Sequence, residues 1–360
     1  GKYTDELIRM AHDMDDKPPK REMDMLLTIG EQMSVSLMAM VMHKLGVPAV
    51  SLNAFQVTMH TTSSHQNARL KRIDTERIRR ELDAHRIVIV TGFQGVDKYD
   101  DYTTLGRGGS DTTAVALAAA LHADACEIYT DVDGVYTADP RKVPNARKLK
   151  EITYDEMLDL ATSGAGVLHN RSVEMAKKYG VPLVVRSSLN NSEGTVVKEV
   201  VSVERMLISG VALDTDAVRI AVLGLRDVPG VAFKVFDTLA KKNINVDVIL
   251  QSIGRAGTKD ISFTVNKDDL DDAVATLEES QERLGFKELH SERNIAKLSI
   301  VGSGMLSNPG VAAKMFESLY NEGVNINMIS TSEIRITVLI NEKDGIRAMN
   351  AVHDAFGLAD

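Results

Sequence analysis

The sequence predicts an α/β fold in which a mostly parallel sheet sandwiched by helices is followed by two ferredoxin-like βαββαβ modules. Three observations support this prediction. In the first half of the 360-residue chain, apolar strand-like runs alternate with helical patterns, as in parallel sheets covered on both faces. The second half contains two copies of one pattern. Two unusual turns follow predicted strands, where ligands bind in such folds.

Composition indicates a soluble globular protein of two or three domains. Hydrophobic residues make up 44% of the chain, and charged residues 26%. The net charge of −9 argues against nucleic acid as a partner, because nucleic-acid-binding proteins usually carry a basic patch. No uninterrupted apolar run reaches the roughly 18 residues of a membrane span. The single cysteine, Cys126, is expected in the core of a protein of the reducing cytoplasm.

The N-terminal part predicts two helices. Residues 5–13 form a short amphipathic pattern, and apolar residues recur at helical spacing over 21–45. Thr28 and Gly30 stand in the middle of the second pattern, where both residue types lower helix stability. These residues indicate a break there, where Glu31 would face a ligand, but periodicity alone favours a solvated glutamate on a helix face.

The next segment predicts the strands and helices of the main sheet. The polar stretch 56–72 favours a surface hairpin or loop, and 73–85 favours a charged helix. An apolar strand follows at 87–91. The remaining elements are predicted as a strand at 125–130, helices at 112–122, 153–162 and 169–178, and a strand at 182–186.

A glycine-rich loop over 103–113 connects a strand to a helix. Backbone N–H groups and the positive end of the helix dipole favour an anion at such a helix start. The glycines at 108–109 allow close approach of the backbone to a ligand, and Arg107 can hold a carboxylate or phosphate in two places. Ser110 and Asp111 are candidates for capping the helix. An ordinary capped turn also has these glycines, but the arginine favours an anion site.

An acidic turn over 130–141 follows the strand at 125–130. It contains Asp131 and Asp133 but lacks the remaining ligands of a calcium loop, and no histidines have the spacing of a zinc site. No metal site is predicted. Because this turn and the glycine-rich loop both follow strands, we expect both at the carboxyl edge of the sheet.

Beyond residue 200 the chain repeats itself. Residues 229–249 align with 309–329 at a constant offset of 80, with nine of 21 pairs identical. Each copy predicts a strand, a helix that opens with Pro-Gly, and two further strands. We expect domains at 1–200, 201–290 and 291–360, and pairing of the modules with each other or across a homodimer or higher oligomer.

Four segments resemble motifs of the aspartokinases, in the amino acid kinase family: residues 21–31, 103–113, 129–141 and 329–334. They occur in the family's order over essentially the whole chain, and the two repeats look like ACT domains, which bind free amino acids. The resemblance implies an amino acid kinase-like fold and phosphorylation of the L-aspartate side-chain carboxylate by ATP with Mg²⁺. The product would be 4-phospho-L-aspartate, which opens the route to lysine, threonine and methionine. Lysine, threonine or both would inhibit at the ACT domains.

The resemblance also implies roles for individual residues. L-aspartate would be bound by Thr4, Glu31, Arg107, Gly108, Gly109 and Ser110. Arg107 would hold a substrate carboxylate during catalysis, and Asp111 would organise a phosphate-handling lysine. ATP would be bound by Tyr129, Thr130, Asp131, Tyr136 and Arg141. Effectors would be bound by Asp227, Asn245, Val246, Asp247 and Gln251 in the first module, and by Val311, Ala312, Asn325, Ile326 and Ser332 in the second.

Two other functions compete with this one. Family members begin with a strand and a Lys-Phe-Gly-Gly loop whose lysine contacts the transferring phosphate, and this sequence contains no such loop. A chain without it is expected to lose a sheet strand and most activity, so a truncated form or a non-catalytic, amino-acid-binding regulatory subunit is an alternative. The intact motifs around Arg107 and Asp131 argue against it. A same-fold kinase for another amino acid or a carbamate is disfavoured by the paired repeats. Asp247 and the negative charge favour lysine as effector.

Overall fold

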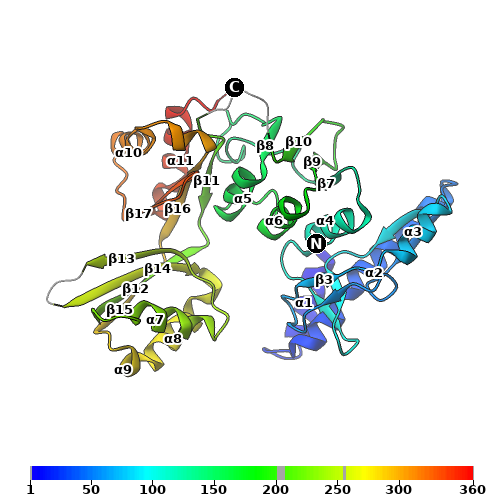
Figure 1. The fold of residues 1–360 in the computed structure, drawn as a ribbon, viewed down its shortest axis with the longest axis horizontal. Coiled ribbons are helices and arrows are strands. Elements are labelled where there is room, and N and C mark those ends of the chain that lie inside the picture. The colour runs from blue at the N-terminus through cyan, green and yellow to red at the C-terminus, as the bar shows by residue number, and fades with distance from the viewer. Residues whose placement is uncertain (1, 201–206, 254–256, 360) are drawn as a thin grey trace. The chain divides into compact units, whose positions relative to one another are not determined.

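The structure, a computed structural model, describes residues 2–200, 207–253 and 257–359 (Figure 1). The chain divides into two compact units, each with its own sheets and core. The first comprises Gly1–Gly134, Lys150–Tyr154 and Val167–Val200, and the second comprises Val135–Leu149, Asp155–Gly166 and Val201–Asp360.

The first unit carries most of the helices and strands predicted from the alternating pattern. Its helices are α1 (Lys2–His12), α2 (Lys20–Lys44), α3 (Glu76–Asp83), α4 (Gly109–Leu121) and α6 (Asn170–Tyr179). Its strands are β1 (Ala49–Leu52), β2 (His60–Thr61), β3 (Leu70–Arg72), β4 (Ile87–Val90), β5 (Gln94–Val96), β6 (Tyr102–Thr104), β7 (Cys126–Thr130), β8 (Glu151–Thr153), β9 (Leu183–Ser187) and β10 (Thr195–Lys198).

Three sheets share these strands. β1 and β4 pair in parallel as a two-stranded sheet. A second sheet has the order β7-β9-β10-β8, with parallel pairs β7–β9 and β8–β10 and an antiparallel pair β9–β10. The short strands form a third sheet, β3-β2-β5-β6. The predicted main sheet is thus divided, since β4 and β7, before and after the glycine-rich loop, belong to different sheets.

Helix α2 is continuous, so the predicted break at Thr28 and Gly30 is wrong. The Thr28 hydroxyl donates to the carbonyl of Met25 at 2.9 Å, so this polar side chain is satisfied within the helix. A Cβ on Gly30 would meet nothing closer than Leu7 Cδ1 at 4.0 Å. Gly30 therefore costs helix propensity without interrupting the hydrogen bonds.

By length and composition alone, α2 also satisfies the criteria for a membrane-crossing helix, and no other described helix does. Polar and charged residues interrupt its apolar residues, so it contains no long uninterrupted apolar run. The helix lies against β1, β4 and β6 and carries Asp24, which is fully buried. One side of the helix thus packs in the first unit, while Leu37, Met40 and Val41 on it are exposed.

The second unit contains α5 (Tyr154–Thr162) and both ferredoxin-like modules. The first module comprises β12 (Ala217–Arg226), α7 (Val231–Ala240), β13 (Asp247–Ile253), β14 (Thr258–Asn266), α8 (Leu270–Glu279), α9 (Gln281–Leu284) and β15 (Glu288–Glu292). The second comprises β11 (Gly210–Asp214), β16 (Ile295–Val301), α10 (Val311–Asn321), β17 (Met328–Thr331), β18 (Arg335–Asn341) and α11 (Gly345–Ala355). Short 3-10 turns stand at Lys267–Asp269, Ser303–Ser307 and Glu342–Asp344.

The two modules have the same sheet but not the same chain path. The first has the order β13-β14-β12-β15, with α7, α8 and α9 on one face (Figure 1). The second has the order β17-β18-β16-β11, so β11 occupies the place of β15. Gly210–Asp214 lies antiparallel to β16, with Gly210 opposite Val301. The second module therefore takes a strand from before the first, and the sheets do not follow a division at residue 290.

Both module helices begin as the Pro-Gly repeat predicts. Gly230 precedes α7 with φ +88°, and Gly310 precedes α10 with φ +93°. Only glycine adopts this left-handed conformation without strain. The first turn of each helix then buries a valine, Val231 or Val311, in the core of its module.

Candidate functional site

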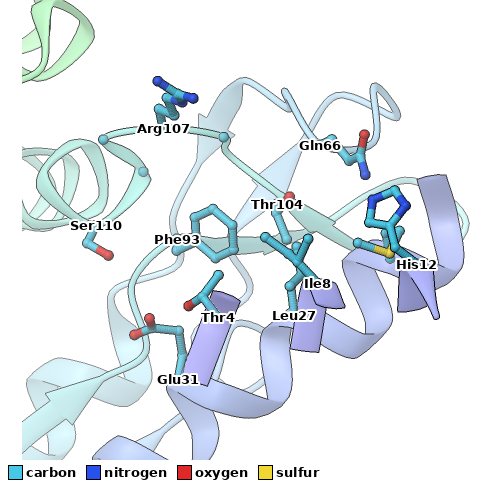
Figure 2. A pocket seen from close by; sticks show the side chains of 14 residues that line it. Thr4, Ile8, His12, Leu27, Glu31, Gln66, Phe93, Thr104, Arg107 and Ser110 are labelled. Carbon is cyan, nitrogen blue, oxygen red and sulfur yellow. The ribbon is translucent and has the colours of Figure 1, made fainter. Parts of the chain in front are cut away.

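A cavity of about 660 Å³ in the first unit is bounded by α1, α2 and the loop between β6 and α4 (Figure 2). Three segments far apart in the sequence supply the residues that the motifs assign to aspartate. All six line this one cavity: Thr4, Glu31, Arg107, Gly108, Gly109 and Ser110. The other lining residues are Ile8, His12, Met23, Leu27, Gln66, Phe93, Thr104 and Gly106.

The glycine-rich loop places the start of α4 at the cavity. Gly108 is the N-cap residue in the left-handed conformation, with φ +67°, and no side chain caps the helix. The predicted capping by Ser110 or Asp111 is therefore wrong. The helix therefore begins without a side-chain cap, and helix starts of this kind favour an anion. A Cβ on Gly108 would lie 2.2 Å from the Cβ of His169, so only glycine fits.

Glu31 and Thr4 lie next to each other in the cavity, from α2 and α1 (Figure 2). Partial burial raises the pKa of the Glu31 carboxyl. Arg107 extends from the loop at the rim (Figure 2). The cavity thus combines a half-buried carboxylate with a guanidinium and a helix start, which suits a ligand that carries both a positive and a negative group.

Asp111 lies in the first turn of α4. Burial raises the pKa of its carboxyl, and the backbone N–H of His169 opposes this by donating to it. Burial also raises the pKa of the Cys126 thiol to about 11, with a contribution from Asp111. Cys126 is buried in β7, so its predicted place in the core is confirmed.

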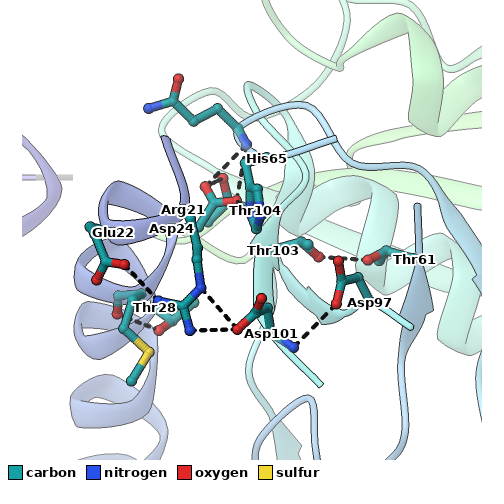
Figure 3. Close-up of polar contacts among 12 residues, drawn as sticks. Arg21, Glu22, Asp24, Thr28, Thr61, His65, Asp97, Asp101, Thr103 and Thr104 are labelled. Carbon is teal, nitrogen blue, oxygen red and sulfur yellow. Dashed lines mark hydrogen bonds and ion pairs between the residues drawn. The ribbon is translucent and has the colours of Figure 1, made fainter. Parts of the chain in front are cut away.

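A buried carboxylate that sequence reasoning missed holds one wall of the cavity (Figure 3). Asp24 accepts a hydrogen bond from the Thr104 hydroxyl at 2.6 Å and from the backbone N–H of Gln66 at 3.0 Å. His65 Nδ1 lies 2.9 Å from Oδ2 of Asp24, the oxygen that accepts from Gln66 at 3.0 Å. Asp24 joins α2 to β6 and to the loop before β3. A signal exists in the sequence, since Asp24 is the one acidic residue within an apolar run.

A second set of polar contacts continues along the same face (Figure 3). Arg21 donates from Nε to Asp101 at 3.0 Å, which ties α2 to the turn before β6. Asp97 accepts from the backbone N–H of Asp101 at 3.2 Å. The hydroxyls of Thr61 and Thr103 lie 2.6 Å apart and join β2 to β6. The stretch 56–72, predicted as a surface hairpin or loop, contains the antiparallel pair β2–β3, but it also contributes buried partners to the site.

Three of the residues assigned to ATP lie at the end of β7 in the first unit. Tyr129 is 58% exposed, and its hydroxyl donates to Glu127 at 2.7 Å. The Thr130 hydroxyl donates to Asp131 at 3.1 Å. These residues form a polar, exposed strand end.

The other two ATP residues belong to the second unit. Tyr136 packs against the core of the second module. Arg141 donates from Nε and Nη2 to the two oxygens of Asp139, at 3.0 and 3.1 Å. Burial alone would raise the pKa of Asp139, but the hydrogen bonds from Arg141 lower it.

Two effector residues of each module occupy equivalent places, Asn245 and Val246 in the first and Asn325 and Ile326 in the second. In the first, Asn245 and Val246 precede β13, Asp247 and Gln251 lie on it, and Asp227 follows β12. In the second, Val311 and Ala312 open α10, Asn325 and Ile326 precede β17, and Ser332 follows it. Ala312 and Ile326 pack against one core, and Val246 packs against the other. Asp227 is paired with Lys259 at 2.8 Å.

Asp247 is engaged by a buried internal lysine. Lys297 Nζ on β16 lies 2.6 Å from Asp247 and 2.9 Å from Asp214, and its side chain is 8% exposed. Burial alone would lower the pKa of Lys297, but the two carboxylates raise it. Burial alone would raise the pKa of Asp247, but the lysine lowers it. The carboxylate that favoured a lysine effector already has an ammonium partner, so this argument for lysine loses its basis.

No group of three or more His, Cys, Asp or Glu side chains that could hold a metal ion occurs within residues 2–200, 207–253 and 257–359.

Comparison with known proteins covers the whole chain. The family model described as the amino acid kinase family matches residues 1–187, and that of the ACT domain matches 220–281 and 298–356. The chain is 51% identical to an aspartokinase of Bacillus sp. (strain MGA3), over 100% of this chain and 88% of that protein. It is 50% identical to aspartokinase 2 of Bacillus subtilis, with the same coverage.

Solved structures agree with the sequence comparisons. E. coli aspartokinase III in complex with aspartate and ADP, in its R-state, superposes with a TM-score of 0.85 at 28% identity, over 98% of this chain and 79% of that chain. The same enzyme with lysine and aspartate, in its T-state, gives 0.73 at 28% identity, over 94% and 76%. The predicted α/β fold followed by two ferredoxin-like modules is confirmed.

Proposed function

We propose, on the premise that this chain belongs to the aspartokinases of the amino acid kinase family, that the cavity lined by Glu31 and Arg107 binds L-aspartate. The enzyme transfers a phosphoryl group from ATP to the side-chain carboxylate of aspartate and forms 4-phospho-L-aspartate and ADP. One observation carries the assignment of the cavity: three distant segments bring six motif residues to one 660 Å³ space.

The charges of the cavity complement those of aspartate. The ammonium group of aspartate would lie at Glu31, whose carboxyl is held partly out of water and gains an opposite charge on binding. A carboxylate of aspartate would be gripped by the Arg107 fork, which makes two parallel hydrogen bonds where an ammonium makes one. Thr4 and Ser110 supply hydroxyl groups beside these charges.

Phosphoryl transfer requires alignment and charge neutralisation more than a protein nucleophile. Ser110 and the backbone N–H groups at the start of α4 would stabilise charge on the acceptor carboxylate. Asp111 would organise groups that handle the phosphate. Mg²⁺, bound with ATP, neutralises phosphate charge. ATP would be bound by Tyr129, Thr130, Asp131, Tyr136 and Arg141.

The two ACT modules are the proposed effector sites. E. coli aspartokinase III has been solved with lysine, and we propose feedback inhibition by lysine, threonine or both in this chain. The contacts would come from Asp227, Asn245, Val246, Asp247 and Gln251, and from Val311, Ala312, Asn325, Ile326 and Ser332. Homodimers or larger assemblies through these modules, in the cytoplasm, complete the proposal.

ADP release with Mg-ATP and L-aspartate tests the activity, with hydroxylamine added in parallel to trap the acyl phosphate as a hydroxamate. We expect ADP and hydroxamate to form together, only with aspartate, and to decrease when lysine or threonine is added singly or together. Binding of lysine or threonine without turnover would instead indicate a regulatory subunit. Turnover with a different amino acid would indicate another kinase of the same fold.

A further inference from the structure

We propose that Arg171, on α6, is a positioning residue that fixes the loop carrying Arg107 in the geometry that binds aspartate. The inference rests on the proposed function of the cavity. No motif assigned Arg171 a role, and it does not line the cavity. It acts through the backbone of two segments that do.

The guanidinium of Arg171 joins two loops. Its Nη1 donates to the carbonyl of Leu105 at 2.6 Å, and its Nη2 donates to the carbonyl of Ala68 at 3.0 Å. The Asn67 side chain lies within 3.4 Å of Nη1. The two loops are also joined directly, because the N–H of Ala68 donates to the carbonyl of Thr104 at 2.9 Å. One planar fork thus holds both edges of the cavity wall.

The acceptors of Arg171 are adjacent to the cavity. Leu105 is fully buried and stands two residues before Arg107. Gly106, next along the chain, lines the cavity and is packed so closely that a Cβ there would lie 2.9 Å from the carbonyl oxygen of Gln66. None of the acceptor atoms belongs to α6. The bonds therefore stabilise the cavity wall rather than the helix that carries the arginine.

The start of α6 touches the loop at two further places. The His169 ring packs against Gly108, and the His169 backbone N–H donates to Asp111. On the opposite side, Asp24 holds the hydroxyl of Thr104. The short segment that displays Arg107 is consequently anchored before it, at 104–105, and after it, at Gly108.

A charged donor in this place is effective because it is half-buried. Burial lowers the pKa of Arg171, and the nearby Arg69 adds to this effect, yet a guanidinium stays protonated in proteins. Hydrogen bonds from a charged donor to carbonyls are stronger than neutral ones. A lysine at this position has one ammonium and cannot match two carbonyl directions with a planar fork.

The test compares Arg171→Ala and Arg171→Lys with Lys178→Ala, an exposed control on the same helix whose ammonium lies over the Tyr179 ring. We expect Arg171→Ala to raise the KM for aspartate about tenfold, as expected for loss of charged hydrogen bonds, with less than a twofold change in the KM for ATP. Arg171→Lys should give a KM for aspartate between those of the wild type and Arg171→Ala. Dilute guanidinium chloride should restore part of the activity of Arg171→Ala. It should not raise the activity of Arg171→Lys or Lys178→Ala.

Wild-type KM and kcat in Arg171→Ala would overturn the proposal. Equal loss of both substrates' binding with a lowered Tm and no rescue by guanidinium would show a merely structural arginine, which also overturns it. Calorimetric titration with aspartate tests the role of Arg171 separately from the proposed kinase function. If the wild type binds aspartate without turnover, the kinase function fails while the affinities of the variants still decide the role of Arg171. If it binds no aspartate, both proposals fail.

Discussion

Replacing Arg107 by lysine tests whether aspartate binding needs the planar guanidinium or only a positive charge. Arg107→Lys keeps the positive charge but replaces a planar fork with a single ammonium. Because two charged hydrogen bonds become one, we predict that the KM for aspartate rises at least about tenfold. Steady-state ADP release at varied aspartate measures it. A KM and kcat equal to those of the wild type would remove Arg107 from the site.

Glu31 predicts how aspartate binding depends on pH. Burial raises the pKa of its carboxyl above the ordinary value of 4.5, and only the ionised form attracts an ammonium. Aspartate affinity should therefore fall as pH decreases through this raised pKa, at a higher pH than an exposed glutamate would give. Glu31→Gln should remove this limb of the pH profile. A profile that is the same in both proteins would contradict the role of Glu31.

At the scale of elements, Lys297 connects three strands, β11, β13 and β16. Replacing it by methionine leaves Asp214, 18% exposed, and Asp247, 37% exposed, without their cation. Because water screens the two carboxylates, the cost should lie between the roughly 1 kcal/mol of a surface pair and the roughly 3 kcal/mol of a fully buried one. Urea denaturation should show this loss of stability in Lys297→Met. Lys241→Met, which breaks an exposed pair with Asp237 on α7, should cost much less. Equal losses in the two variants would show that the buried bridge is no stronger than a surface one.

Most helices and strands were predictable, because the spacing of apolar residues indicates which face of each element is buried. The repeat predicted both module helices and their glycine starts, and the alternating pattern predicted α3, α4 and α6 within a few residues. The three-residue strands β5 and β6 were not predicted, since so few residues show no periodicity. The predicted helix break at Gly30 is wrong because the low helix propensity of glycine is a small free energy that packing overrides.

The site was predictable only as far as its motifs. The apolar residues around Asp24 hint at its burial, but nothing local in the sequence shows that its partners are Thr104 and Gln66. Nor does anything local show that Arg171 reaches the carbonyl of Leu105, because such partners are brought together only by the tertiary fold. Charged side chains are expected at the surface. The two acceptors of Arg171 are backbone carbonyls, which every residue has, so the residue types at these positions do not indicate the contact.

At the scale of the whole molecule, β11 joins sequence-distant parts of the second module. Along the chain, β11 stands directly before β12, the first strand of the first module. It nevertheless completes the sheet of the second module, where it pairs with β16. The edge of β16 would otherwise be unpaired, and exposed sheet edges favour aggregation. The connection of the modules is therefore a property of the pairing and not of the repeat.

This connection makes a prediction for Ala212→Pro, at the centre of β11. Proline removes a backbone donor and distorts the strand, so we expect faster amide hydrogen exchange in β16 and β11. Exchange in β12 and β14 of the first module should stay as in the wild type. The opposite pattern, with protection lost from β12 and kept in β16, would contradict the observed pairing.

The central claim is that the cavity of the first unit recognises L-aspartate through opposite charges. The most direct measurement is calorimetric titration of the wild type and Glu31→Gln with L-aspartate and with succinate, which has the two carboxylates but no ammonium. Our account predicts that the substitution weakens aspartate binding at least about tenfold, as expected for a lost charged contact, and does not weaken succinate binding, since a carboxylate that only repels a dianion has been removed. Aspartate binding that is equally tight in both proteins would contradict it.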